Sequence, residues 1–343
     1  MWRLVRKLEV LLISCQIAAN SKNFRLMPHL RMLLKTIRFL VKILPSRFPE
    51  ITYTVLLRPR PLRRLAHRVL LRCVPSHVMV DGLKLYLNPS DPVLSPSIAL
   101  GIYENYEREV FRQFCKPGSV VVDVGANVGL YTVIAASRVG KNGKVIAIEP
   151  HPESYRYLQK TIQANGLSGV KSFNLALGDR RETISLFLTD ENKADSRIYD
   201  ATGQRPKITT QMIDLDHLLA ENEINAVQLI KMDIQGAEGL ALRGMLGTLA
   251  KSPEIVIFTE FWPWGIEETG ESAAGFLREL MRAGFRFKAI DENKRQLTDV
   301  PDIEQLIARH DKLQYAGTDF RRSHANLICI KDGMNHEVQS DQR

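Results

Sequence analysis

Val120-Val-Val-Asp-Val-Gly-Ala-Asn-Val-Gly-Leu-Tyr-Thr132 is the stretch that decides the fold, because an apolar strand leads into a glycine-spaced loop and a helix-like segment follows directly. Gly125 and Gly129 have no Cβ, so the backbone can turn sharply and lie against a ligand, toward which N–H groups of the following helix point. A second apolar strand, residues 144–148, ends in Glu149, where doubly wound folds place a ribose-binding carboxylate. The stretch predicts a βαβ unit with a nucleotide-type cofactor site.

The loop also indicates which cofactor fits. Its spacing, Gly125-x-x-x-Gly129, differs from the G-x-G-x-x-G of dinucleotide enzymes, and no Gly-Lys-Ser/Thr follows as in a P-loop. Asp123 would repel a pyrophosphate at short range but would suit a ligand with a positive charge. S-adenosylmethionine is such a ligand, since it carries a sulfonium, an ammonium, an adenine and a ribose. The alternative for Asp123 is a helix-capping acid in an α/β domain without a ligand.

Motifs further along the chain narrow the class. Ala176-Leu-Gly-Asp179 is followed by Lys231-Met-Asp-Ile-Gln-Gly-Ala-Glu238. With the glycine loop, these motifs resemble the FkbM family of S-adenosylmethionine-dependent methyltransferases over residues 77–331. The resemblance implies an α/β class I methyltransferase fold, which is Rossmann-like and doubly wound around a mostly parallel seven-stranded sheet. The remaining stretches that carry it are Asp81-Gly82, Tyr103-Glu104, Glu149-Pro150, Thr209-Thr210 and Ile213-Asp214.

The resemblance also implies an activity and a cofactor site. Members of the family typically O-methylate sugars, glycolipids, polyketides or similar natural products. Gln235 departs from the family pattern, which usually has an acid before the glycine, and this weakens any role proposed for that position. The predicted cofactor-binding residues are Asp123, Gly125, Ala126, Asn127, Gly129, Glu149, Pro150, Ala176 and Leu177.

Four predicted strands end in carboxylates, namely Asp123, Glu149, Asp233 and Glu260. Ligands of open parallel sheets collect beyond the carboxyl ends of the strands, so we expect these acids to face one crevice. A sugar hydroxyl is a poor nucleophile near neutral pH, and a general base within hydrogen-bond reach helps it react. We therefore expect Asp233 to be the base or to orient the acceptor. The alternatives are a contact to the methionine part of the cofactor and a purely structural role.

Three further residues complete the predicted catalytic set: Lys231, Glu238 and Glu260. Lys231 shares a strand face with Asp233, two residues away, and can hold that acid ionised or form a structural ion pair. Hard cations need several oxygen ligands, and the sequence offers no dedicated loop for them. We predict no metal site.

Charge is unevenly distributed along the chain. The net charge of the 343 residues is +9, yet residues 1–75 hold 16 Lys or Arg and two acids, a net of +14, which leaves −5 for the rest. Leucines and basic residues between 30 and 44 recur on two faces at helical spacing, which predicts an amphipathic helix able to lie on an anionic membrane. A helical cap on the catalytic domain or on a second subunit is equally compatible. We predict three regions: a basic helical extension (1–75), a methyltransferase domain (76–335) and a polar tail (336–343).

Smaller features complete the expected organisation. Asp81-Gly82 predicts a hairpin before the main sheet. Residues 170–177 are expected to form the third strand, and residues 182–188 and 206–212 two added strands around a polar loop, 190–203. That loop either covers a site or is simply exposed. The aromatic run 261–264 can stack on a sugar ring, pack in the core or anchor a loop.

The leading hypothesis is an S-adenosylmethionine-dependent O-methyltransferase for a glycan, glycolipid or related small molecule, cytoplasmic and peripheral on a membrane if the extension binds there. The alternative is a non-catalytic cofactor-binding or scaffold protein of the same fold. An N-methyltransferase is disfavoured, since no Asn/Asp-Pro-Pro-Tyr/Phe motif follows the fourth strand. We predict no nucleic-acid partner, because the basic segment has few aromatic residues for stacking on bases.

Overall fold

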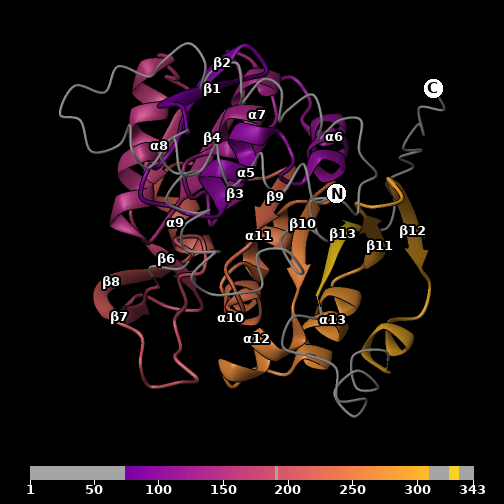
Figure 1. Ribbon diagram of the computed structural model, residues 1–343. Coiled ribbons are helices and arrows are strands. Elements are labelled where there is room, and N and C mark those ends of the chain that lie inside the picture. Colours follow the sequence, from indigo (N-terminus) through magenta and orange to yellow (C-terminus); the bar gives the residue numbers. More distant parts are fainter. Residues whose placement is uncertain (1–73, 190–191, 309–323, 332–343) are drawn as a thin grey trace, which may run out of the picture. The chain divides into compact units, whose positions relative to one another are not determined.

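The computed structural model describes residues 74–189, 192–308 and 324–331 (Figure 1). Nearly all of the predicted basic extension, and the whole of the predicted polar tail, lie outside the described residues. No helix in the described part of the chain combines the length and the apolar character needed to cross a bilayer. The chain divides into two compact units, Met1–Ser76 with Pro89–Tyr103, and His77–Asn88 with Glu104–Arg343.

The described part of the first unit contains one short helix, α5 (Leu94–Leu100). The carboxylate of Asp91 accepts hydrogen bonds from the N–H groups of Val93, Leu94 and Ser95, which satisfies donors at the start of this helix. Gly101 ends the helix in the left-handed conformation at φ 72°.

The second unit begins with the predicted hairpin. Strands β1 (His77–Val80) and β2 (Leu83–Tyr86) pair antiparallel around Asp81 and Gly82, whose φ angles are 48° and 82°. Positive φ at both turn residues matches the twist of the flanking strands and explains the Asp-Gly dipeptide. The hairpin is tied to the next helical layer by the N–H of Tyr86, which donates to Oγ1 of Thr161 at 3.1 Å.

An eight-stranded sheet forms the centre of this unit, in the order β12-β11-β13-β10-β9-β3-β4-β5. The five strands from β10 to β5 run parallel, and β11, β12 and β13 form an antiparallel edge. The predicted doubly wound, mostly parallel sheet is confirmed, with β12 as an additional edge strand. The strands are β3 (Val120–Val124), β4 (Lys144–Ile148), β5 (Val170–Phe173), β9 (Leu229–Met232), β10 (Val256–Phe261), β11 (Phe285–Asp291), β12 (Gln296–Val300) and β13 (Ala325–Lys331).

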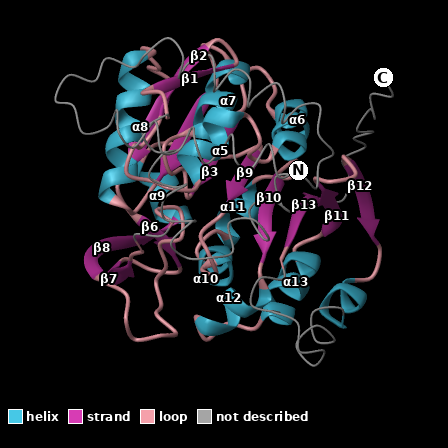
Figure 2. Ribbon diagram, in the orientation of Figure 1, coloured by secondary structure: helices cyan, strands magenta, loops and turns pink. Residues whose placement is uncertain are grey.

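Helices flank the strands in two groups, α6–α8 and α9–α13, as Figure 2 shows. The second group packs on a continuous apolar core that includes Val122, Ile230, Ile257 and Leu277. Because helices cover both faces, the central strands are apolar throughout instead of alternating. The helices are α6 (Asn105–Phe114), α7 (Leu130–Val139), α8 (Pro152–Ala164), α9 (Leu215–Glu221), α10 (Glu238–Arg243), α11 (Leu246–Lys251), α12 (Pro263–Glu268) and α13 (Ala273–Arg282).

A separate three-stranded sheet, β6-β8-β7, corrects one prediction. Residues 170–177 do not form a single strand: β5 ends at Phe173, and β6 (Ala176–Gly178) pairs parallel with β8 (Lys207–Asp214). Asn174 separates the two because its side-chain amide donates to the carbonyl oxygens of Glu149 and Pro150. The predicted pair of added strands is present, with β7 (Glu182–Phe187) antiparallel to β8.

Candidate active site

The glycine loop after β3 packs against the end of β9. Gly125 has φ 82°, and a Cβ on it would lie 2.0 Å from the carbonyl oxygen of Asp233. Only glycine permits this approach. The loop is also held from the β4 side, because the N–H groups of Gly125 and Ala126 both donate to the carbonyl of Ile148. Since these N–H groups have partners within the protein, the loop presents a preformed backbone surface.

Asp123 is buried near the end of β3. Its Oδ2 accepts a hydrogen bond of 2.5 Å from Oγ1 of Thr132 in α7. Burial raises the pKa of Asp123 to about 6, against the opposing effects of the Thr132 hydroxyl and the Lys231 charge. Thr132 lies within the quoted stretch, but the sequence alone gave no sign that its hydroxyl would face back onto the strand.

Glu149 fastens the glycine loop to the end of β4. Its Oε2 accepts from the N–H of Asn127, and its Oε1 from the N–H of His151, both at 2.8 Å. Burial raises the pKa of Glu149 to about 7, although these two backbone donors lower it. His151 begins α8, since its Nδ1 accepts from the N–H groups of Glu153 and Ser154. Each oxygen of Glu149 keeps a second lone pair, so a ribose contact is compatible with this geometry.

The Gly-x-Glu part of the later motif folds the loop after β9. Glu238 is fully buried, with Oε1 accepting from the N–H of Ile234 at 3.0 Å and Oε2 from the N–H of Gly236 at 2.9 Å. A Cβ on Gly236 would lie 2.4 Å from the carbonyl oxygen of Gly265. Burial raises the pKa of Glu238 to about 7. These contacts support the loop, and catalysis by Glu238 stays a prediction.

Gln235 connects two of the strand-terminal acids. Its Nε2 donates to Oδ1 of Asp233 at 2.9 Å and lies 3.4 Å from Oε2 of Glu260. Asp233 and Glu260 are both partly exposed. Burial raises the pKa of Glu260 well above its ordinary value, and the charges of Asp233 and Glu238 add to this effect. We expected the four strand-terminal acids to face one crevice, and these interactions agree with that expectation. Asp233 also lies near enough to Asp123 and Glu149 for its charge to add to the rise of their pKa values that burial causes.

Lys231 is the only lysine or arginine that is buried within the described residues. Its Nζ lies 3.0 Å from Oε1 of Glu107 in α6 and 5.0 Å from the ring centre of Tyr131. The hydroxyl of Tyr131 donates to Glu104 at 2.7 Å. Burial opposes the charge on Lys231, yet Glu107, Glu104 and Asp233 together raise its pKa above the ordinary value.

Glu104 and Glu107 were not predicted as site residues. Glu104 adopts a left-handed φ of 42° before α6, and burial and the charge of Glu107 raise its pKa to about 8. The usable signal was Lys231 itself, because a lysine inside an apolar strand needs a counter-ion. The sequence could not tell which acid supplies it.

The balance of charge in this region favours a cationic ligand. Among the residues that the structure describes, Lys231 is the one buried cation, and several carboxylates lie near it. Those with a raised pKa are Glu104, Asp123, Glu149, Glu238 and Glu260. A positive charge placed among them would stabilise their ionised forms. Within the described ranges, no group of three or more histidine, cysteine or acidic side chains is arranged to hold a metal ion.

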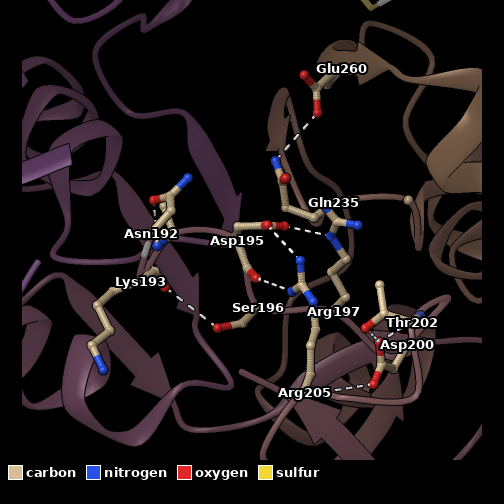
Figure 3. Close-up of polar contacts among 12 residues, drawn as sticks. Asn192, Lys193, Asp195, Ser196, Arg197, Asp200, Thr202, Arg205, Gln235 and Glu260 are labelled. Carbon is tan, nitrogen blue, oxygen red and sulfur yellow. Dashed lines mark hydrogen bonds and ion pairs between the residues drawn. The ribbon is translucent and has the colours of Figure 1, made fainter. Parts of the chain in front are cut away.

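The polar loop between β7 and β8 is organised by its own charges. Asp195 accepts from Arg197 at 2.5 Å and from Arg205 at 2.8 Å (Figure 3). The guanidinium of Arg197 also lies over the ring of Trp262, 4.6 Å from its centre. The aromatic run 261–264 was expected to stack on a sugar, to pack in the core or to anchor a loop. These contacts match the third role, an anchor for the polar loop just beyond Glu260.

Ala176 and Leu177 are buried in β6, outside the main sheet. Gly178 follows them because a Cβ there would lie 2.2 Å from Sδ of Met212. Asp179 then pairs with Arg243 of α10 at 3.0 Å. The Ala-Leu-Gly-Asp motif therefore joins the small sheet to α10, and the predicted adenine contact of Ala176 and Leu177 stays a prediction.

Comparison with known proteins agrees with this arrangement. Residues 123–287 match the model of the methyltransferase FkbM domain. The match spans just under half of the chain, and over these residues the chain is similar to this family. The match confirms the predicted family and, with it, an S-adenosylmethionine-dependent methyltransferase.

Individual relatives are distant. Methyltransferase 1 of Beauveria bassiana is 23% identical over 192 residues, which cover 49% of this chain and 74% of that protein. The 2-O-methyltransferase NoeI of Sinorhizobium fredii is 23% identical over 188 residues, covering 50% and 73%. A crystal structure of methyltransferase FkbM from Methylobacillus flagellatus is 14% identical with a TM-score of 0.38, covering 78% of this chain and 59% of that chain.

Proposed function

We propose that this protein transfers a methyl group from S-adenosylmethionine to a hydroxyl group of a sugar, glycolipid or related natural product. The observation that carries the proposal is the position of Asp233. Its backbone carbonyl packs against Gly125 of the cofactor loop, while its partly exposed side chain accepts from Gln235. A carboxylate held beside the cofactor loop is suited to receive the proton of an acceptor hydroxyl.

The residues present fit the cofactor. The close approach at Gly125 leaves a backbone surface without side chains, and the buried carboxylates supply negative charge with one buried cation among them. Asp123, Glu149 and the backbone of the loop between Gly125 and Gly129 would hold S-adenosylmethionine. When bound, this cofactor supplies an electrophilic methyl group on a positively charged sulfur.

The chain's own residues would then perform two tasks. Asp233 would orient the acceptor hydroxyl and take its proton as the oxygen forms its bond to the methyl carbon, while the carbon–sulfur bond breaks and its electron pair stays on sulfur. Lys231, fixed by Glu107, would keep the nearby carboxylates ionised through its charge. The name of the 2-O-methyltransferase among the relatives supports oxygen as the acceptor atom.

Asp233→Asn should lower methyl transfer by about 10²- to 10⁴-fold, the usual contribution of a positioned base, because the amide keeps the shape but cannot take a proton. The assay follows radiolabelled methyl groups from S-adenosylmethionine into neutral glycans and glycolipids. The quantity measured is the radiolabel that stays on the acceptor after treatment with mild alkali. Cofactor binding should change far less than methyl transfer, since most of the loss is one of proton transfer.

Asp299→Asn is the matched control, because Asp299 is an exposed partner of Lys288 on β11 and β12. A variant at Asp233 as active as this control would contradict the assigned base. Cofactor binding without transfer to any acceptor would favour the non-catalytic alternative. Membrane contact through residues 1–75 stays a prediction from the sequence.

A further inference from the structure

Gln235 occupies a strained backbone position between two acids. Its φ is 55°, in the left-handed region, which is unfavourable for a residue with a Cβ. Strain of this kind persists where the surroundings hold a residue in place. The amide nitrogen reaches Asp233 at 2.9 Å and Glu260 at 3.4 Å, and Figure 3 shows the side chain directed toward Glu260.

An amide donor differs from the other groups in this region because it carries no charge. It stabilises the ionised form of a carboxylate by hydrogen bonding without adding a cation or competing for a proton. Glu260 and Asp233 repel each other when both are ionised, and the charge of Asp233 raises the pKa of Glu260. A shared N–H donor lowers that repulsion for both acids.

We propose that Gln235 is a positioning residue for methyl transfer, whose amide orients the Asp233 carboxylate and keeps Asp233 and Glu260 available as a negatively charged pair toward the sulfonium. The inference rests on the proposed function. It adds that Gln235 helps the protein to bind the positively charged cofactor more tightly than the neutral product. S-adenosylhomocysteine, the product, lacks the transferred methyl group and the charge on sulfur but keeps the remaining groups of the cofactor. The ratio of the two affinities therefore isolates the electrostatic effect.

Other charged groups also act on this pair and must stay constant in the test. Lys231 comes from β9, and Glu238 from the start of α10. His324 precedes β13, with Nε2 3.9 Å from Oε1 of Glu260. The remaining groups that affect the electrostatics of Asp233 and Glu260 are Glu104, Asp123 and Glu149.

The test measures binding of S-adenosylmethionine and of S-adenosylhomocysteine by calorimetry at pH 6.5 and 8.5, using the full chain. Gln235→Met removes the donor and should lower the affinity ratio at pH 6.5 by about threefold or more, with little change at pH 8.5. The reason is that Glu260, whose pKa burial already raises, holds its proton to a still higher pH without the Gln235 donor. Gln235→Glu should raise the ratio at pH 8.5 by about threefold or more, because it adds a negative charge there.

Gln211→Met is the control, since Gln211 is exposed on β8 and its amide donates to Oγ1 of Thr183, away from Asp233 and Glu260 in the sequence. Ratios within about twofold of wild type in both Gln235 variants, at both pH values, would overturn the proposal. If Gln235→Met fails to fold, the nearly isosteric Gln235→Glu decides alone. A folded wild type that binds neither ligand would instead overturn the proposed function, and the role of Gln235 with it.

Discussion

Gly125→Ala should destabilise the domain by roughly 3 kcal/mol or more, from left-handed strain together with overpacking, and should abolish binding of S-adenosylmethionine. The added Cβ would lie 2.0 Å from the carbonyl oxygen of Asp233 and 3.2 Å from Cγ2 of Ile234. Because the first of these is a backbone atom, the strain cannot be relieved by a change of rotamer. The loop or the end of β9 must move, and both belong to the proposed site. Urea unfolding and calorimetric titration measure the two effects.

Gly118→Ala separates the clash from the backbone conformation. Gly118 has φ 79°, close to that of Gly125, but nothing lies within 4 Å of the position that a Cβ would take. We expect this control to lose only about 1–2 kcal/mol and to bind the cofactor normally. Equal losses in the two variants would show that the packing of Gly125 against Asp233 has no special importance.

Lys231→Met should cost about 3–5 kcal/mol, because it leaves a buried acid without its cation. Glu107 is 1% exposed, and its carboxylate has Lys231 as its ion-pair partner at 3.0 Å. Adding Glu107→Gln removes the uncompensated charge and should recover part of the loss. Lys288→Met tests an exposed pair, with Asp299 at 2.5 Å, and should cost less than about 1 kcal/mol. No recovery in the double variant would argue against the ion pair as the cause.

The loss in Lys231→Met should grow as the pH rises above about 6. In the folded protein burial raises the pKa of Asp123 to about 6, and the charge of Lys231 limits that rise. Without Lys231 the folded pKa increases further, while the unfolded value stays near about 3.9. Between these values the folded state holds a proton that the unfolded state has released, so stability falls with rising pH. We expect about 1 kcal/mol of additional loss between pH 6 and 8.5, seen in urea titrations, for a shift of about one pKa unit.

The parallel strands and the glycine loop were predictable because their signals are local. Apolar runs end in acids or glycine, and Asp81-Gly82 specifies a tight turn. The edge strand β12 was missed since its five residues, Gln-Leu-Thr-Asp-Val, carry only a weak apolar alternation. The break between β5 and β6 depends on the Asn174 amide, which contacts backbone carbonyls more than twenty residues earlier.

The site was predictable only in part, for the same reason. The strand-terminal acids follow from topology, since carboxyl ends of parallel strands meet at one edge. The counter-ion of Lys231 and the stacking of Arg197 on Trp262 join residues far apart in the sequence. Gln235 was treated as a departure from a pattern, whereas its amide connects Asp233 and Glu260.

The most direct test of the central claim is a calorimetric titration of the full chain with S-adenosylmethionine, beside the variant Asp123→Asn/Glu149→Gln. This double substitution keeps the shape of both side chains and removes both charges. We predict micromolar-range binding by the wild type and a loss of at least about a hundredfold in the variant, on the order expected for two charge contacts in a partly buried site. Equal affinities would place the cofactor elsewhere, and no binding by a folded wild type would contradict the assignment of this site.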